Sequence, residues 1–193
     1  MPDQFSLGVA AAAQQIRDKA LSPVSLVESL LDRIDSLDPA LKAWVTIDRE
    51  DVIRTAQELK QELNEKGPRG SIHGVPVGLK DIFYTEGMLT AAGSKIYADF
   101  VPKYDATTVT KIKDAGGIIL GKAVTTEFAM ADPSPSVNPW NKAHTPGGSS
   151  SGSSGRRTSS SKSGPASPMP SGINLTKPPP SLRWRLETRI EAR

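Results

Sequence analysis

The sequence predicts an α/β fold in which helices flank a β-sheet. The alternation of Val75, Val77 and Leu79 predicts a half-buried strand at 75–80, and the wholly apolar run at 118–120 predicts a second, short strand. Between them, Val109 and Ile112 lie at helical spacing, so strand, helix and strand form a βαβ unit. Such a unit makes the two strands parallel and places helices over the faces of the sheet.

The first third of the chain is predicted to be mainly helical. Residues 7–20 are rich in alanine, glutamine and charged residues, which favour helices. Ser22-Pro23 indicates the start of a second helix, which Asp38-Pro39 is expected to end. An apolar stripe at helical spacing predicts that this second helix packs against a neighbour, and it consists of Leu26, Val27, Leu30, Leu31, Ile34 and Leu37.

A strand and a third helix follow. Residues 43–47 are rich in β-branched and aromatic side chains, which is typical of a strand. An amphipathic helix comes next, and Gly67-Pro68 ends it. Its apolar face is formed by Val52, Ile53, Ala56, Leu59 and Leu63.

The middle of the chain alternates between strand and helix. Asp105 is expected to cap the helix between the two apolar strands, and Gly116-Gly117 to end it. Residues 125–130 are predicted to form a short helix. Residues 132–140 contain three prolines and are expected to form an ordered loop or a hinge.

A stretch rich in glycine and serine, HTPGGSSSGSSG, occupies residues 144–155. By composition it is typical of a flexible linker. Glycine also lets a backbone approach a substrate closely, however, and serine hydroxyls can supply chemistry. Lys80 favours this second interpretation, because it closes an alternating apolar strand and strand ends commonly face a cleft.

Together, HGVPVGLKD at 73–81 and TPGGSSSGSSG at 145–155 resemble the amidase signature family, whose members hydrolyse or transfer amides. Bacterial small-amide amidases and the A subunit of glutamyl-tRNA amidotransferase are among its members. The resemblance extends from near the N-terminus to about Ser154. It implies a mixed sheet flanked by helices, here incomplete and followed by a disordered C-terminal tail.

The resemblance also implies roles for individual residues. Lys80 matches a buried lysine base, and Ser149 matches a serine on a cis peptide bond that relays a proton to that base. Gly147, Gly148 and Ser150 are the expected substrate-binding residues. A lysine can act as a base when it is neutral, and burial away from water lowers the pKa of a lysine amine toward that state.

The third member of the implied Ser-cisSer-Lys triad, the nucleophilic serine, is expected about two dozen residues after Ser149 in a Gly-Gly-Ser-(Ile/Val)-x-Arg turn. The amides of that turn would form the oxyanion hole. The sequence contains no such turn, because Ser171 has neither paired glycines before it nor an arginine soon after. The two histidines, His73 and His144, each lie beside a glycine- or proline-rich turn and are expected to be structural.

The pattern changes at Arg156. Residues 156–180 have almost no apolar periodicity and cannot bury enough surface to offset their ordering entropy, so we expect disorder. A brief basic helix is possible at 182–190. We therefore expect residues 1–155 to be the N-terminal part of an amidase domain and 156–193 to be a disordered, out-of-frame tail. An engineered linker and a deliberately short binding protein are the alternatives.

Two classes of function follow. The first is an amidase-family hydrolase of carbon–nitrogen bonds that is truncated and inactive as this chain. The second is a non-catalytic amidase remnant or interaction module, or a fragment of an amidotransferase A subunit. The absent Gly-Gly-Ser-x-x-Arg turn favours an inactive product.

Composition restricts the class of protein, its binding partners and its location. A hydrophobic fraction of 37% and a charged fraction of 23% suit a soluble protein, and a net charge of +3 is too small to indicate direct nucleic-acid binding. The absence of cysteine excludes disulfides and thiolate metal sites. No membrane span or leader is predicted, so a cytoplasmic location is expected. No motif requires a metal or other cofactor, and the expected partner is a small-molecule amide, with the oligomeric state left open.

Overall fold

The computed structural model of the chain describes residues 3–130 and 132–160. Within them, a three-stranded sheet has the order β1-β3-β2. The strands are β1 (Trp44–Thr46), β2 (Pro76–Lys80) and β3 (Ile118–Ala123). β2 and β3 are parallel, as the βαβ pattern predicts, and β1 is antiparallel to β3. The sheet is therefore mixed, which confirms the fold implied by the family resemblance.

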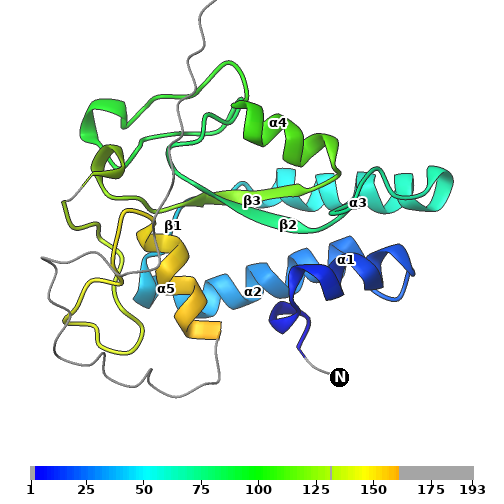
Figure 1. The fold of residues 1–193 in the computed structure, drawn as a ribbon, viewed down its shortest axis with the longest axis horizontal. Coiled ribbons are helices and arrows are strands. Elements are labelled where there is room, and N and C mark those ends of the chain that lie inside the picture. The colour runs from blue at the N-terminus through cyan, green and yellow to red at the C-terminus, as the bar shows by residue number, and fades with distance from the viewer. Residues whose placement is uncertain (1–2, 131, 161–193) are drawn as a thin grey trace, which may run out of the picture. The chain divides into compact units, whose positions relative to one another are not determined.

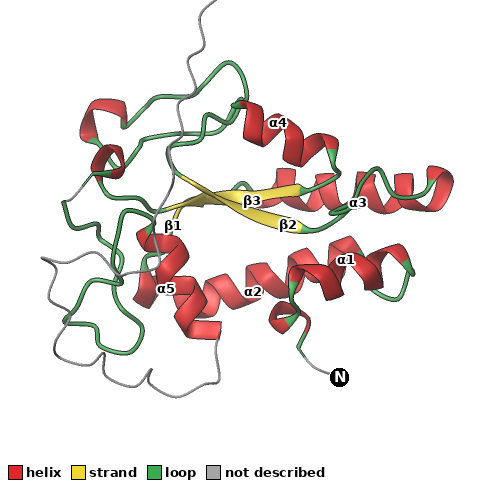
Figure 2. Ribbon diagram, viewed as in Figure 1, coloured by secondary structure: helices red, strands yellow, loops and turns green. Residues whose placement is uncertain are grey.

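Helices cover both faces of the sheet (Figures 1 and 2). On one side lie α1 (Val9–Arg17), α2 (Pro23–Leu41) and α3 (Arg49–Lys66), and on the other lies α4 (Thr107–Asp114). Three short 3₁₀ helices, η1 (Gln4–Ser6), η2 (Lys95–Tyr97) and η3 (Glu127–Ala129), and a final helix, α5 (Ser151–Ser160), complete the described elements.

β3 is buried along its whole length between these layers. Ile118 and Leu120 belong to a core cluster with residues of α2 and α3, whereas Ile119 packs with Val109 of α4. Successive side chains of a strand point to opposite faces, so one apolar strand joins both cores. This packing fixes β3 and, through it, the parallel strand β2.

α2 begins as predicted but ends later than expected. The Ser22 hydroxyl accepts a hydrogen bond from the Val24 amide, and Pro23 is the first helical residue. The prediction that Asp38-Pro39 ends the helix is wrong, because α2 continues to Leu41. Asp38 holds the last turn closed: its carbonyl accepts from the Lys42 amide at 2.8 Å and its carboxylate from the Ala43 amide at 2.7 Å.

Asp105 does not cap α4, contrary to the prediction. Ala106 occupies the N-cap position and makes no side-chain capping bond. The Asp105 carboxylate instead accepts from the Glu86 amide at 2.8 Å and from Lys113 Nζ at 2.6 Å. An ion pair with the last turn of the helix has replaced the cap, and it ties the preceding loop to α4.

The segment from 125 to 150 is mostly loop. The short helix predicted at 125–130 is only the 3₁₀ helix η3, in which Phe128 and Ala129 have left-handed φ angles of 45° and 59°. The proline-rich loop is ordered against the end of α2, because Ser136 Oγ donates to the Lys42 carbonyl at 2.6 Å and the Val137 amide to the Leu41 carbonyl.

The glycine- and serine-rich stretch continues into regular structure. Its first part forms a loop, and α5 starts at Ser151 and runs to Ser160, past the domain boundary expected at residue 155. The flexible-linker interpretation therefore does not describe residues 151–155. The rest of the expected tail, 161–193, lies outside the described residues, as does the basic helix expected at 182–190.

Candidate active site

Two segments that are 69 residues apart in the chain meet at the carboxyl end of β2. Lys80 is the last residue of that strand, and its Nζ donates a hydrogen bond to Ser149 Oγ at 2.6 Å. Both side chains are half-buried. An amine and a hydroxyl at this distance can exchange a proton directly.

The sheet determines where Lys80 lies. Lys80 is paired with Ala123 of β3, and the next amide, that of Asp81, donates to the Ala123 carbonyl at 2.9 Å. Leu79 packs into the core beneath α4. Because side chains alternate along a strand, Lys80 points to the opposite face from Leu79.

Ser149 is held from the other side by two threonines that follow β3. Its carbonyl accepts hydrogen bonds from the Thr126 amide at 3.1 Å and from Thr125 Oγ1 at 3.0 Å. The peptide bond between Gly148 and Ser149 is cis. Gly147 has a φ of 96°, a left-handed conformation that glycine adopts readily. A Cβ at Gly148 would lie 3.1 Å from the Thr126 methyl group.

A surface hollow opens beside Ser149. The structure brings Lys80 and Ser149 together and places Gly147 and Gly148 in the lining of this hollow, whereas Ser150 is not part of the lining. The carbonyl of Ser150 instead accepts from the Ser154 amide in the first turn of α5. The complete lining consists of Thr126, Ala129, Met130, Pro133, Thr145, Gly147, Gly148 and Ser149.

A buried ion pair lies directly behind Lys80. Lys122 of β3 and Asp81 are both fully buried, with 3.5 Å between Nζ and Oδ1. Burial lowers the pKa of the Lys122 amine and raises the pKa of the Asp81 carboxyl, and the opposite charge of the partner counteracts both shifts. Sequence reasoning missed this pair, although a lysine inside an otherwise apolar strand was a visible signal.

The histidines do not belong to this site. His73 is 3% exposed, and its Nδ1 accepts from the Arg69 amide at 3.0 Å. Its Nε2 lies 2.9 Å from the Leu59 carbonyl, an arrangement that needs the proton on Nε2. Both ring nitrogens are therefore engaged in hydrogen bonds with the backbone, and His73 has a structural role. His144 is exposed in the loop, where its backbone pairs with Asn138 and Asn141.

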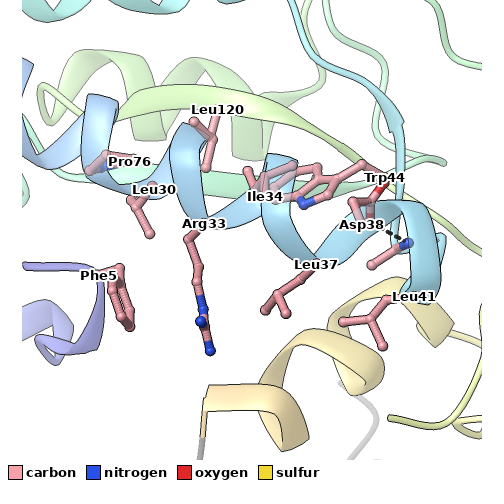
Figure 3. Close-up of a pocket in the computed structure, with 12 residues that line it drawn as sticks. Phe5, Leu30, Arg33, Ile34, Leu37, Asp38, Leu41, Trp44, Pro76 and Leu120 are labelled. Atoms are coloured by element: carbon pink, nitrogen blue, oxygen red, sulfur yellow. Dashed lines mark hydrogen bonds between the residues drawn. The ribbon is translucent and has the colours of Figure 1, made fainter. Parts of the chain in front are cut away.

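A second pocket lies between α2 and the sheet (Figure 3), and Ser149 is not among the residues that line it. Its wall is mainly apolar, with Leu30, Ile34, Trp44 and Leu120 among the residues drawn. Of its two charged side chains, Asp38 accepts from the Ala43 amide and Arg33 lies 4.8 Å from the centre of the Phe5 ring. Because both already have partners, this pocket offers no group poised for chemistry, and the candidate active site is the one at Lys80.

Among residues 3–130 and 132–160, no group of three or more histidine, aspartate or glutamate side chains could hold a metal ion. In the same part of the chain, no helix is both long enough and apolar enough to cross a membrane.

Comparison with known proteins decides the family. Residues 25–155 match the family model described as Amidase. The chain belongs to the amidase signature family. Its curated relatives include the A subunit of the glutamyl-tRNA(Gln) amidotransferase of Desulfatibacillum aliphaticivorans, 37% identical over 153 residues, which cover 76% of this chain and 31% of that protein. The corresponding protein of Azoarcus sp. (strain BH72) is 41% identical over 155 residues, which cover 77% and 32%.

Solved structures of amidases agree with this assignment. The native peptide amidase from Stenotrophomonas maltophilia superposes with a TM-score of 0.68 at 33% identity, covering 75% of this chain and 32% of that one. A bacterial aryl acylamidase of the amidase signature family gives a TM-score of 0.72 at 25% identity, covering 79% and 33%. This chain thus spans about a third of the length of its relatives.

Proposed function

We propose that the chain carries the base and the proton relay of an amide-hydrolysing site, with Lys80 as the base and Ser149 as the relay. The observation that carries this proposal is the 2.6 Å contact between Lys80 Nζ and Ser149 Oγ. With its amine neutral, Lys80 accepts the Ser149 proton along this same contact. Ser149 in turn takes the proton of a nucleophilic hydroxyl that attacks the amide carbon.

The second half of the reaction returns the proton. As the tetrahedral intermediate collapses, Lys80 gives the proton back through Ser149 to the departing nitrogen, which leaves as ammonia or an amine. The acyl group stays on the nucleophile until water releases it as a carboxylic acid. We place the carboxamide in the hollow beside Ser149, along the backbone of Gly147 and Gly148. The substrate-binding role expected of Ser150 stays a prediction.

We further propose that the nucleophile does not come from residues 1–155 or from Ser171, and that the 193-residue chain is inactive by itself. The absence of a Gly-Gly-Ser-x-x-Arg turn after Ser149 supports this. Without the nucleophile and its oxyanion hole, Lys80 and Ser149 have no acyl group to act on.

The A component of an amidotransferase is the second candidate, because the Desulfatibacillum and Azoarcus relatives carry that name and are 37% and 41% identical. In that case the substrate is an amide donor and the ammonia passes to an acceptor bound by a partner. Both candidate functions use the proton transfer between Lys80 and Ser149. They differ in the fate of the released ammonia or amine, which a hydrolase releases to water and an amidotransferase passes to an acceptor.

A chimera tests the shared step. Residues 1–155 are joined to the part of the Azoarcus relative that follows its matched stretch, and ammonia release is measured from glutamine, acetamide and a peptide amide. We expect activity in the chimera and none in the 193-residue chain. Lys80→Met should abolish the activity, whereas Lys111→Met, which changes an exposed lysine of α4, should leave it intact.

The outcomes separate the proposals. An active chimera that keeps its rate after Lys80→Met refutes the base role. Ammonia release from the 193-residue chain itself refutes the proposal that the nucleophile comes from outside this chain, and Ser171 would then be the first residue to test. Preference for glutamine over the simple amides favours the amidotransferase candidate.

A further inference from the structure

Lys122 makes three polar contacts from a fully buried position in β3. Its Nζ donates to the Phe83 carbonyl and to Thr90 Oγ1, both at 2.6 Å, and lies 3.5 Å from Asp81 Oδ1. All three acceptors belong to residues 81–90, the segment that immediately follows Lys80. The Lys122 ammonium therefore contacts three residues of the turn that follows β2, namely Asp81, Phe83 and Thr90.

The Asp81 carboxylate depends on this ammonium. Among the groups that favour its ionised form, Lys122 has the largest effect, and the backbone amides of Gly93 and Ala91 add to it. A buried charge is costly unless an opposite charge compensates it. A hydrophobic residue would fill the Lys122 position in an apolar strand at lower cost, so packing alone does not account for the pair.

The pair lies between the two anchors of the candidate active site. On one side, Asp81 is the neighbour of Lys80, and both are held against Ala123 of β3. On the other side, the Ala92 carbonyl accepts from the Phe128 amide at 2.8 Å, which connects the same segment to η3 beside the hollow. A shift of residues 81–92 would therefore move Lys80 relative to Ser149.

We propose that Lys122 and Asp81 are positioning residues that hold the turn after β2 so that Lys80 Nζ stays against Ser149 Oγ. The proposal deepens the proposed function and rests on it for its catalytic meaning. The positioning itself can be measured in the 193-residue chain without any turnover.

The test measures how accessible the Lys80 amine is. The chain is reductively methylated with formaldehyde and a borane reductant, and the rate at each lysine is followed by mass spectrometry of its peptides. In Lys122→Met we expect methylation of Lys80 to rise about fivefold, the factor that corresponds to one lost hydrogen bond of about 1 kcal/mol. The NMR cross-peak between the side chains of Lys80 and Ser149 should disappear in the same variant.

Two further variants keep the test decisive. Thr90→Val removes one acceptor of Lys122 with little change of shape, so it should raise Lys80 methylation in the same direction by a smaller factor, even if Lys122→Met fails to fold. The double variant Asp81→Asn/Lys122→Met removes both charges and leaves no unpaired carboxylate. It should raise Lys80 methylation less than Lys122→Met does, but still above the wild-type rate, because the contacts of Lys122 with Phe83 and Thr90 remain lost.

Lys113→Met is the matched control, because it breaks another lysine–aspartate pair, with Asp105, on α4. It should leave Lys80 methylation unchanged. The proposal is overturned if Lys80 keeps its wild-type rate in Thr90→Val and in folded Lys122→Met, or if Lys113→Met raises the rate equally. Because the test needs no substrate, an inactive chimera leaves its result unaffected.

Discussion

The amide of Gly152 donates a hydrogen bond to the carbonyl of Val124 at 2.9 Å, which fixes the first turn of α5 against the end of β3. A Cβ at Gly152 would lie 2.2 Å from the Ala43 carbonyl oxygen and 2.6 Å from the Val124 amide nitrogen. Both are backbone atoms, which cannot rotate away. Glycine at this position lets the helix start close enough to the sheet to bring Ser149 to Lys80.

Gly152→Ala should therefore destabilise the chain. The added methyl group forces α5 away from β3, and overpacking of this kind costs about 1–3 kcal/mol. Thermal unfolding followed by circular dichroism should show a lower Tm than in the wild type.

Gly155→Ala provides the control on the same helix. A Cβ there would meet only the Val137 carbonyl at 3.6 Å, an ordinary van der Waals contact. We expect its Tm to equal that of the wild type or to exceed it slightly, since alanine favours helices. Equal losses of Tm in the two variants would contradict the role given to the close approach at Gly152.

The central strand should be the most sensitive part of the core. Ile118 has no exposed surface and packs with residues of α2 and α3, so Ile118→Ala should lower the free energy of unfolding by about 2–5 kcal/mol. Ile96→Ala, at a side chain that is 78% exposed, should change it by less than about 0.5 kcal/mol. Urea unfolding of both variants measures the difference, and similar midpoints would place Ile118 outside a tight core.

Much of this architecture could be predicted because its signals are local. The runs at 75–80 and 118–120 and the helix between them identify a parallel pair without any tertiary information. The direction of β1 could not be predicted in this way, since an alternating pattern is the same in a parallel and an antiparallel strand. The mixed character of the sheet came from the family resemblance.

The two errors have a common cause, which is that hydrogen bonds of a single residue, some to neighbours a few positions away and some across the fold, override the usual meaning of its residue type. Pro39 marks a helix end in sequence, yet contacts of Asp38 with Lys42 and Ala43 keep the last turn closed. Asp105 is a good capping residue, yet Lys113 and the Glu86 amide take its carboxylate.

Part of the candidate site could be predicted from local sequence and part could not. Lys80 and Ser149 stand in motifs that can be read from the sequence, whereas the partners of Lys122 become visible only when residues 81–90 fold back over β3. A charged side chain in an apolar strand indicates that a buried partner exists but does not say which one.

A surface ion pair should make stability depend on pH in a definable range. Hydrogen bonding by Arg69 holds the pKa of Glu62 below its ordinary value of 4.5. A carboxyl whose pKa is depressed on folding stabilises the folded state above that ordinary value, and the effect is lost as pH falls through the lower folded pKa. Because Arg69 is 44% exposed, the gain at neutral pH should be only about 0.2–1 kcal/mol.

Glu62→Gln isolates this contribution. At pH 7 and low salt, the variant should unfold at a slightly lower temperature than the wild type, and this difference should shrink as pH falls below 4.5 and through the lower folded pKa of Glu62. Glu86→Gln, at an exposed glutamate elsewhere on the surface, is the control and should show no such difference. If the difference in unfolding temperature between Glu62→Gln and the wild type grew as pH fell, it would contradict a stabilising effect of ionised Glu62.

The relay role of Ser149 makes the sharpest prediction about activity. In the chimera described above, Ser149→Ala removes the hydroxyl that Lys80 contacts, so the proton has no path from the nucleophile to the base. Positioned acid–base groups contribute about 10²–10⁴-fold to rate, and kcat should fall by a factor in this range. KM should change little, because the Ser149 carbonyl, which holds the loop to Thr125 and Thr126, is retained.

Ser153→Ala, at an exposed serine of α5 in the same glycine- and serine-rich stretch, is the matched control and should leave kcat unchanged. A fall in kcat that is equal in the two variants would indicate damage to α5. A rise in KM with kcat preserved in Ser149→Ala would instead assign Ser149 to substrate binding, and Lys80 would then need a different proton donor.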